Sequence, residues 1–218
     1  MPTILTEIFG VDGSRQHIIF ELFALFILIA LGVFAIRKKD SPIAKIFSAV
    51  VEFWRGLSQS LLPEEEVKKH TNFISVLFLF ILFMNLLGLI PGFMPPTMNI
   101  NTNLGIALFV FLYYNYHGFK KHGLGYIKHF LGPFLPVAFL YFPIELISHV
   151  FRILSLSIRL AGNMTGDHSV LEIFTHLTYL LVPVAFLILG TIVSVVQAFV
   201  FSILSLIYIA LAVGEEGH

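Results

Sequence analysis

Long apolar stretches separated by short polar intervals are the main pattern of this chain. About 20 helical residues cross the roughly 30 Å of hydrocarbon in a membrane. The pattern therefore predicts an all-α membrane protein that forms a single integral membrane domain. The third predicted span is short for a crossing and must borrow flanking residues. About five transmembrane helices are predicted, over residues 17–36, 73–90, 101–117, 133–162 and 170–213.

A further helix is predicted over residues 42–62, where apolar side chains recur with a helical period. Lys45, Glu52 and Arg55 lie on the opposite side of this helix. This arrangement is typical of an amphipathic helix that lies in the membrane interface. The alternative is a small amphipathic helix docked on the transmembrane helices.

The apolar stretch from Leu171 to Val213 allows two interpretations. As one helix it would be about 65 Å long, which is twice the thickness of the hydrocarbon. It could instead be a hairpin of two spans that turns near Pro183 or Gly190. Neither residue is accompanied by the polar turn residues that a membrane hairpin normally needs. We therefore expect a single, steeply tilted helix.

The basic residues are unevenly distributed among the loops. Segments 37–71 and 117–129 hold most of the 13 Lys and Arg residues, whereas segments 91–103 and 160–218 hold none. By the positive-inside rule, the two basic segments are cytoplasmic. This topology places the N-terminus outside and the C-terminus in the cytoplasm.

Composition supports the assignment to the membrane and excludes other classes. The chain is 57% hydrophobic and only 12% charged, about half the charged share of a soluble domain. The absence of a leader pattern at the N-terminus indicates a mature sequence. A formal net charge of zero gives no basis for binding nucleic acid. With no cysteine, disulfides and thiolate metal sites are excluded.

A polar stripe crosses the apolar sequence around Arg159. At about 100° per residue, its members fall within about 80° of one another on a helix, so one face meets protein or water. An arginine buried in lipid costs about 3 to 17 kcal/mol and cannot lose its charge. Arg159 therefore needs a carboxylate, a water-filled cavity or a partner protein. The stripe comprises Glu145, His149, Arg152, Arg159, Asn163 and Asp167.

A second polar stripe is predicted on the last helix, and the two stripes should face each other or a shared surface. Gln197 is the expected neighbour of Arg159, because its amide oxygen can accept from a guanidinium without neutralising it. The second stripe comprises Glu172, His176, Pro183, Gly190, Ser194, Gln197, Ser205 and Tyr208.

Titratable groups lie on both sides of Arg159. Glu145 and His149 precede it by about 21 and 15 Å along a helix. Two sets of proton-exchanging groups separated by a fixed positive charge indicate two half-pathways with a barrier between them. The carboxylate that passes this barrier must come from a partner, because the chain has none in mid-span. The groups beyond Arg159 are Asp167, His168, Glu172 and His176.

Four motifs resemble those of subunit a of F-type ATP synthases, the membrane stator that conducts protons to a rotor ring. They are SLSIRLAGNM at 155–164, MNLLGLIPG at 84–92, NINTNLGIAL at 99–108 and QAFVFSILSLIYI at 197–209. The resemblance implies that Arg159 is the essential stator arginine. It also implies that Glu145 belongs to the inner half-channel, and that Asn163, His168 and Gln197 line or adjoin the outer one.

The resemblance further implies that the last two helices form a long, tilted hairpin against a ring of small acidic hairpin subunits. Expected partners also include peripheral-stalk b subunits and lipid, in a bacterial inner membrane. The chain would not be catalytic by itself, and we expect no metal or cofactor. The coupling ion, H⁺ or Na⁺, is left open, because its selectivity would lie mainly in the rotor.

The sequence departs from the family pattern in the outer half-channel. Many members have a carboxylate at position 168, where this chain has histidine, and Gly190 stands where a titratable partner is expected. Asp167, Glu172 or His176 could substitute. Ser194 and Tyr208 are further candidates, although Tyr208 could be an ordinary interface aromatic.

Two alternatives come from other functional classes. A secondary transporter would use Arg159 to bind an anionic substrate, and it predicts internal repeats, which the two halves of the chain do not show. An intramembrane hydrolase would need a nucleophile and a base, such as Ser155 or Ser157 with His149. No strong motif supports it.

Overall fold

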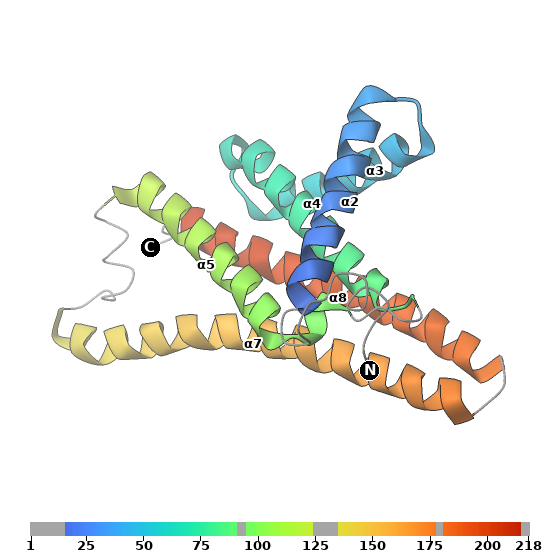
Figure 1. Ribbon diagram of the computed structural model, residues 1–218. Helices are drawn as coiled ribbons and strands as arrows, with labels where there is room; N and C mark the ends of the chain where they lie inside the picture. Colours follow the sequence, from blue (N-terminus) through green and yellow to red (C-terminus); the bar gives the residue numbers. More distant parts are fainter. Residues whose placement is uncertain (1–15, 91–94, 124–134, 178–180, 215–218) are drawn as a thin grey trace.

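The computed structural model describes residues 16–90, 95–123, 135–177 and 181–214. Every regular element in these ranges is a helix, which confirms the all-α prediction for this part of the chain (Figure 1). The elements are α2 (Gln16–Arg37), α3 (Pro42–Leu61), α4 (Glu64–Leu87), the 3₁₀ helix η2 (Pro96–Met98), α5 (Ile100–His122), α7 (Leu135–Leu177) and α8 (Leu181–Val213).

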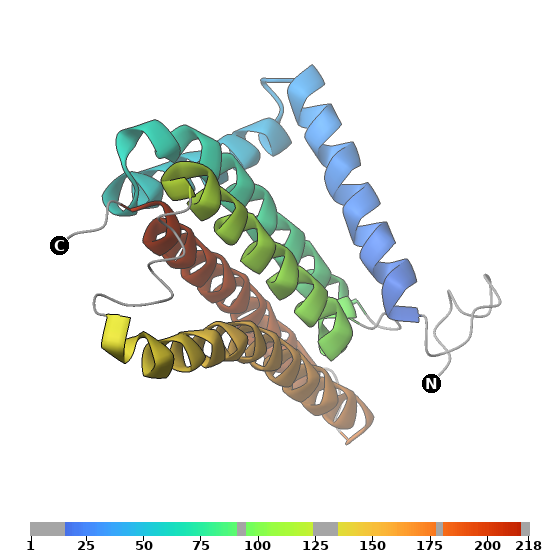
Figure 2. The ribbon, with the colours of Figure 1, turned by 90° about the vertical axis from the view of Figure 1, so that its left-hand side faces the viewer.

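The helices α4, α5 and α8 form the centre of the bundle. Figure 2 shows α2 at one edge and α7 at the other. The buried core is built mainly from α4, α5 and α8, with Leu156, Leu160 and Met164 contributed by one face of α7. These three residues recur every four positions and share one face of α7, which borders the polar stripe, so that His149 is buried beside them while Arg159 is exposed.

Helix α3 corresponds to the amphipathic helix predicted over 42–62. Ser41 caps it by accepting from the Ala44 amide at 3.2 Å, and Pro42 occupies its first position. Trp54 is fully buried, with its ring centroid 5.6 Å from that of Phe78 on α4 and 5.7 Å from that of Phe199 on α8. This packing is that of a helix docked on the bundle, and its orientation in the membrane interface stays a prediction.

Helix α4 starts at Glu64, nine residues before the predicted start at residue 73. Pro63 precedes it, and Glu64, Glu65 and Glu66 occupy its first turn. Negative side chains are favourable at the N-terminus of a helix because of the helix dipole. The polar interval before the apolar run is therefore helical, and hydropathy alone does not reveal its conformation.

Helix α5 is longer than the predicted span 101–117. It begins after Asn99, which accepts from the Asn101 amide at 2.9 Å, and ends at Gly123, whose φ of 57° suits glycine. Lys120 and Lys121 lie in the last turn, where the helix dipole favours positive charge. Its 23 residues extend over about 35 Å, which removes the shortage of length that the apolar run suggested.

The prediction of one helix from Leu171 to Val213 is wrong. Helix α7 runs for 43 residues to Leu177, and α8 begins at Leu181. The two helices lie antiparallel as a hairpin (Figure 1). Pro183 falls in the first turn of α8, where a missing N–H needs no partner. Gly162 and Gly166 do not end α7, because an isolated helical glycine costs only about 1 kcal/mol relative to alanine.

Three of the described helices are long and apolar enough to cross a membrane, namely Ile18–Arg37, Glu64–Leu87 and Val184–Val213. Large apolar side chains such as Phe26 and Ile36 point outward from α2. These features fit a membrane protein. The count of five spans stays a prediction, since α5 and α7 are not among the three.

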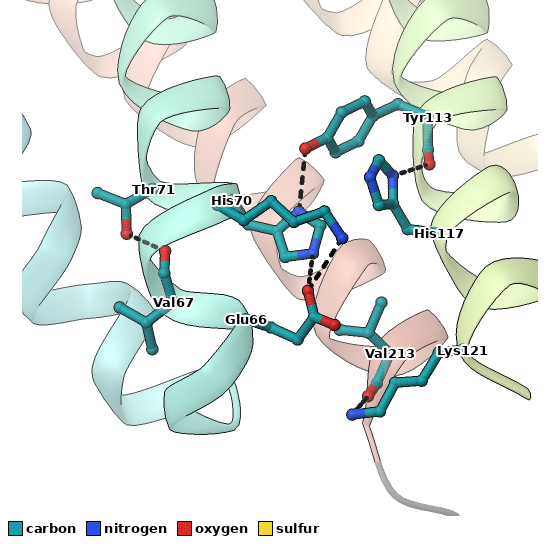
Figure 3. A network of polar contacts seen from close by, with 9 residues as sticks. Glu66, Val67, His70, Thr71, Tyr113, His117, Lys121 and Val213 are labelled. Atoms are coloured by element: carbon teal, nitrogen blue, oxygen red, sulfur yellow. Dashed lines mark hydrogen bonds and ion pairs between the residues drawn. The ribbon is translucent and has the colours of Figure 1, made fainter.

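A polar network joins the start of α4 to the ends of α5 and α8 (Figure 3). His70 Nε2 lies 3.1 Å from Glu66 Oε2, and His70 Nδ1 lies 3.1 Å from the Tyr113 hydroxyl. Lys121 Nζ donates to the Val213 carbonyl at 2.8 Å. The three helix ends that the charge pattern assigns to the cytoplasm therefore lie together.

Candidate functional site

Arg159 lies near the middle of the exposed face of α7. Its side chain is exposed, and it makes no hydrogen bond or ion pair with the residues that the structure describes. Around it the surface of the α7–α8 hairpin is apolar, with Ile158, Ile192 and Val196 all more than half exposed. Gly162 adds an open position one turn later, where a side chain would meet nothing within 4 Å. A permanent cation thus stands on an uncovered apolar face.

Asn163 and Gln197 connect the polar stripes of α7 and α8. Asn163 Nδ2 donates to Gln197 Oε1 at 2.8 Å. Gln197 is 4% exposed, so its amide lies between the helices. We expected this oxygen to accept from Arg159, and the structure gives it to Asn163 instead. The two stripes do face each other at this point.

A small cavity lies beyond Arg159, toward the turn of the hairpin. Its volume is about 20 Å³, enough for about one water molecule. Asp167 and His168 line it from α7, and Gly190 and Ser194 line it from α8. Asp167 Oδ2 and His168 Nδ1 are buried and lack a hydrogen-bond partner within the described ranges. Buried polar atoms are normally hydrogen-bonded to protein groups or to ordered water, and this cavity has room for about one water molecule.

The absence of a side chain at Gly190 has a steric reason. A Cβ atom at this position would lie 3.0 Å from Leu89 Cδ2, tighter than nine in ten real contacts, so the Leu89 side chain would have to shift by a few tenths of an ångström. Any side chain here would push Leu89 and narrow the cavity. The titratable group expected at position 190 therefore has no room while Leu89 keeps its place.

A chain of buried amides and hydroxyls supports the cavity. Asn85 Nδ2 donates to the Ser194 carbonyl at 3.2 Å, and Thr97 Oγ1 donates to Asn85 Oδ1 at 2.8 Å. Asn103 Nδ2 donates to the Thr97 carbonyl at 2.7 Å and lies 3.4 Å from the Ser157 carbonyl. These bonds tie α4, η2 and α5 to the two hairpin helices.

Sequence reasoning missed the role of Asn85, Thr97 and Asn103. The signal was present, because an amide within an apolar helix must find partners when it is buried. Asn85 and Asn103 lie in two of the motifs that carry the family resemblance, whereas Thr97 lies outside all four. Their partners, however, lie 54 and 109 residues away for Asn103 and Asn85, a separation that periodicity cannot bridge.

On the other side of Arg159, His149 pairs with a residue that the sequence did not single out. His149 Nδ1 lies 2.8 Å from the hydroxyl of Tyr114 on α5. The ring centroids of Tyr114 and of Tyr208 on α8 are 6.1 Å apart. The Arg152 guanidinium lies over the Tyr208 ring, 5.3 Å from its centroid. This aromatic group and the cavity near Asp167 lie on opposite sides of Arg159 along α7.

Three predicted titratable residues have side chains outside the described part of the structure. Glu145, Glu172 and His176 belong to α7 by their backbone. Placing Glu172 and His176 on the same helix as Gly190 is therefore wrong, because the chain turns between them. Among the residues predicted for the second stripe, Ser194, Gln197, Ser205 and Tyr208 do lie on α8. The Ser205 hydroxyl donates to the Phe201 carbonyl at 2.8 Å within the same helix.

Comparison with known proteins gives a consistent family assignment. The family described as ATP synthase A chain matches residues 18–210. ATP synthase subunit a of Geotalea daltonii is 40% identical over 217 residues, covering 99% of this chain and 94% of the relative. The Bdellovibrio bacteriovorus subunit is 44% identical over 172 residues, covering 78% of this chain and 75% of the relative.

The four motifs, the helical membrane architecture and these matches agree over most of the chain. The family is that of a membrane subunit of the Fo complex, which serves ATP synthesis and proton transport. This chain belongs to the F-type ATP synthase subunit a family.

Proposed function

We propose that this chain is the stator that conducts protons through two offset half-channels, and that Arg159 prevents a direct leak between them. The observation that carries the proposal is the position of Arg159. It stands exposed on an apolar face, between a cavity lined by Asp167 and His168 and the buried pair of His149 and Tyr114.

Proton uptake would occur through the outer half-channel, on the side of the hairpin turn. A proton entering there would pass Asp167 and His168, whose unpartnered buried atoms border the small cavity. It would then neutralise a carboxylate on the rotor ring. Once neutral, that rotor subunit can move into lipid, because the cost of placing its charge in hydrocarbon has been removed.

Proton release would occur through the inner half-channel after nearly a full turn. The rotor carboxylic acid would give up its proton toward the part of α7 that carries His149 and Glu145. Each elementary charge that crosses the membrane releases about 2.3 kcal/mol per 100 mV. Run in reverse, ATP hydrolysis would drive protons outward by the same path.

Arg159 suits the role of a barrier because it is a permanent cation. A guanidinium does not deprotonate at cellular pH, so its charge repels protons at every stage. It also stabilises the ionised form of a nearby rotor carboxylate, which promotes proton release before that carboxylate passes. No carboxylate among the described residues pairs with Arg159, so the rotor carboxylate would be its counter-charge.

The same proposal sets the partners and the orientation. The uncovered apolar surface of α7 and α8 would meet a ring of small acidic hairpin subunits, and peripheral-stalk b subunits would complete the stator. Five helices would cross a bacterial inner membrane, with the N-terminus outside and the C-terminus in the cytoplasm. The chain would conduct ions and would not itself be catalytic.

The test uses the complete ATP synthase in inverted membrane vesicles. Arg159→Ala should abolish ATP-driven acidification of the vesicles, while ATP hydrolysis by the catalytic head continues. Arg159→Lys should also fail, because a lysine is a point charge that can deprotonate and lacks the planar fork of donors. Normal acidification with either variant would overturn the proposal.

A further inference from the structure

Helix α5 carries two adjacent tyrosines that bind histidines on different helices. The Tyr113 hydroxyl lies 3.1 Å from His70 Nδ1 on α4, whereas the Tyr114 hydroxyl lies 2.8 Å from His149 Nδ1 on α7. Figure 3 shows the first of these pairs. Successive helical residues point about 100° apart, so the two hydroxyls serve separate sites.

The Tyr114–His149 pair is enclosed by three helices. Tyr114 is 3% exposed and His149 is 4% exposed. Phe111 of α5 covers the imidazole edge-on, with ring centroids 5.7 Å apart. In so dry a place, a protonated imidazole needs a hydrogen-bond acceptor to offset the loss of water.

The ionisable residues near this pair come from α7, α8 and α5. On α7, Arg152 follows His149 by one turn, and Glu145 precedes it by one turn, with a side chain outside the described residues. On α8, Tyr208 is the ionisable residue, and the sequence of that helix contains no other. On α5, the group that faces His149 is Tyr114 itself. Tyr114 supplies a direct hydrogen-bond partner for His149 at 2.8 Å.

We propose that Tyr114 is a positioning residue of the inner half-channel, which holds His149 in the tautomer that exchanges protons at Nε2. This inference rests on the proposed function. His149 Nδ1–H donates to the Tyr114 oxygen, which leaves the Nε2 lone pair as the proton acceptor. The hydrogen bond at Nδ1 is kept whether Nε2 carries a proton or not, and it is stronger when the imidazole is charged.

The proton transfers balance within the half-channel. During pumping, a proton from the cytoplasmic side binds to Nε2 of neutral His149 and gives an imidazolium. The imidazolium then releases the same Nε2 proton toward the rotor carboxylate, which becomes a carboxylic acid, and neutral His149 is restored. Tyr114 keeps its own proton throughout, so it is neither consumed nor ionised.

Removing the Tyr114 hydroxyl should selectively disfavour protonated His149. A hydrogen bond from a charged donor is stronger than one from a neutral donor. In Tyr114→Phe we expect ATP-driven pumping to fall about tenfold at neutral pH on the cytoplasmic side. The midpoint of its pH profile should move by about one unit toward acid.

Inverted vesicles expose the cytoplasmic side to the medium, so the pH there can be varied directly. Tyr113→Phe is the matched control, because it removes a hydroxyl that binds His70 and leaves the His149 site intact. The control should keep the wild-type midpoint.

An unchanged pH profile in Tyr114→Phe would overturn the inference, and so would an equal shift in Tyr113→Phe. If Tyr114→Phe does not accumulate in the membrane, His149→Gln serves instead. A glutamine amide can still bind Tyr114 but cannot titrate, so pumping should be lost, and wild-type pumping would contradict the inference. Arg159→Ala separates the two proposals: if it abolishes pumping while Tyr114→Phe changes nothing, only this inference fails.

Discussion

Asn163 on α7 donates a hydrogen bond to Gln197 on α8 at 2.8 Å, one helical turn beyond Arg159. This bond links the two hairpin helices one turn away from the exposed guanidinium of Arg159. It holds two helices together without using the charge of Arg159. The arginine is thereby left available for a group outside this chain.

Gln197→Leu should weaken the hairpin and lower ATP-driven pumping. Leucine is similar in size but removes the acceptor of Asn163 Nδ2, which should cost about 0.5 to 1.5 kcal/mol for one hydrogen bond. Asn163→Leu in the same chain should restore part of the lost thermal stability, because neither polar partner is then left unpaired. A thermal-unfolding series of the two single variants and the double variant measures this coupling. Strictly additive losses would show that the bond contributes nothing.

Gly190→Ala should narrow the cavity beside Asp167 and His168. The new methyl group would meet Leu89 Cδ2 at 3.0 Å, and the most direct response is a shift of Leu89 or of α8. Pumping should fall several-fold, and adding Leu89→Ala should recover it by making room. Gly105→Ala on α5 is the control, since its methyl group would meet nothing within 4 Å. If the Leu89→Ala addition brings no recovery, the steric account of position 190 is wrong.

Asn85→Leu should destabilise the protein more than the replacement of an exposed asparagine does. Asn85 binds both the Ser194 carbonyl and the Thr97 hydroxyl within the buried support of the cavity. Loss of these bonds should cost about 1 to 3 kcal/mol of unfolding free energy and reduce the amount of assembled complex. Asn101→Leu, at an exposed position, should behave like the wild type. Equal abundance of the two variants would argue against a structural role for Asn85.

The apolar pattern was sufficient to predict a helical membrane protein and the approximate position of each long helix. It predicted one continuous helix over Leu171–Val213, because the rule of polar turn residues does not anticipate that α7 ends at Leu177 and α8 begins at Leu181. It also shortened α4 and α5. Their polar first and last turns are helical for reasons of capping and helix dipole, which hydropathy does not measure.

The sequence also located Arg159 and the residues near it along α7, because helical spacing relates positions within one helix. It could not pair Tyr114 with His149 or Asn85 with Ser194, since these contacts depend on how different helices pack. For the same reason it assigned the Gln197 acceptor to the wrong donor. The residue types indicated which side chains take part in the site, whereas their hydrogen-bond partners could be identified only from the packing of the helices.

The central claim is that Arg159 blocks a direct proton leak between the half-channels. The most direct measurement is proton leakage through the complete ATP synthase in sealed vesicles, with the catalytic head stalled so that the rotor cannot turn. The wild-type complex should remain tight, and Arg159→Ala should leak protons down an imposed pH gradient. A stalled Arg159→Ala complex that is as tight as the wild type would contradict the account.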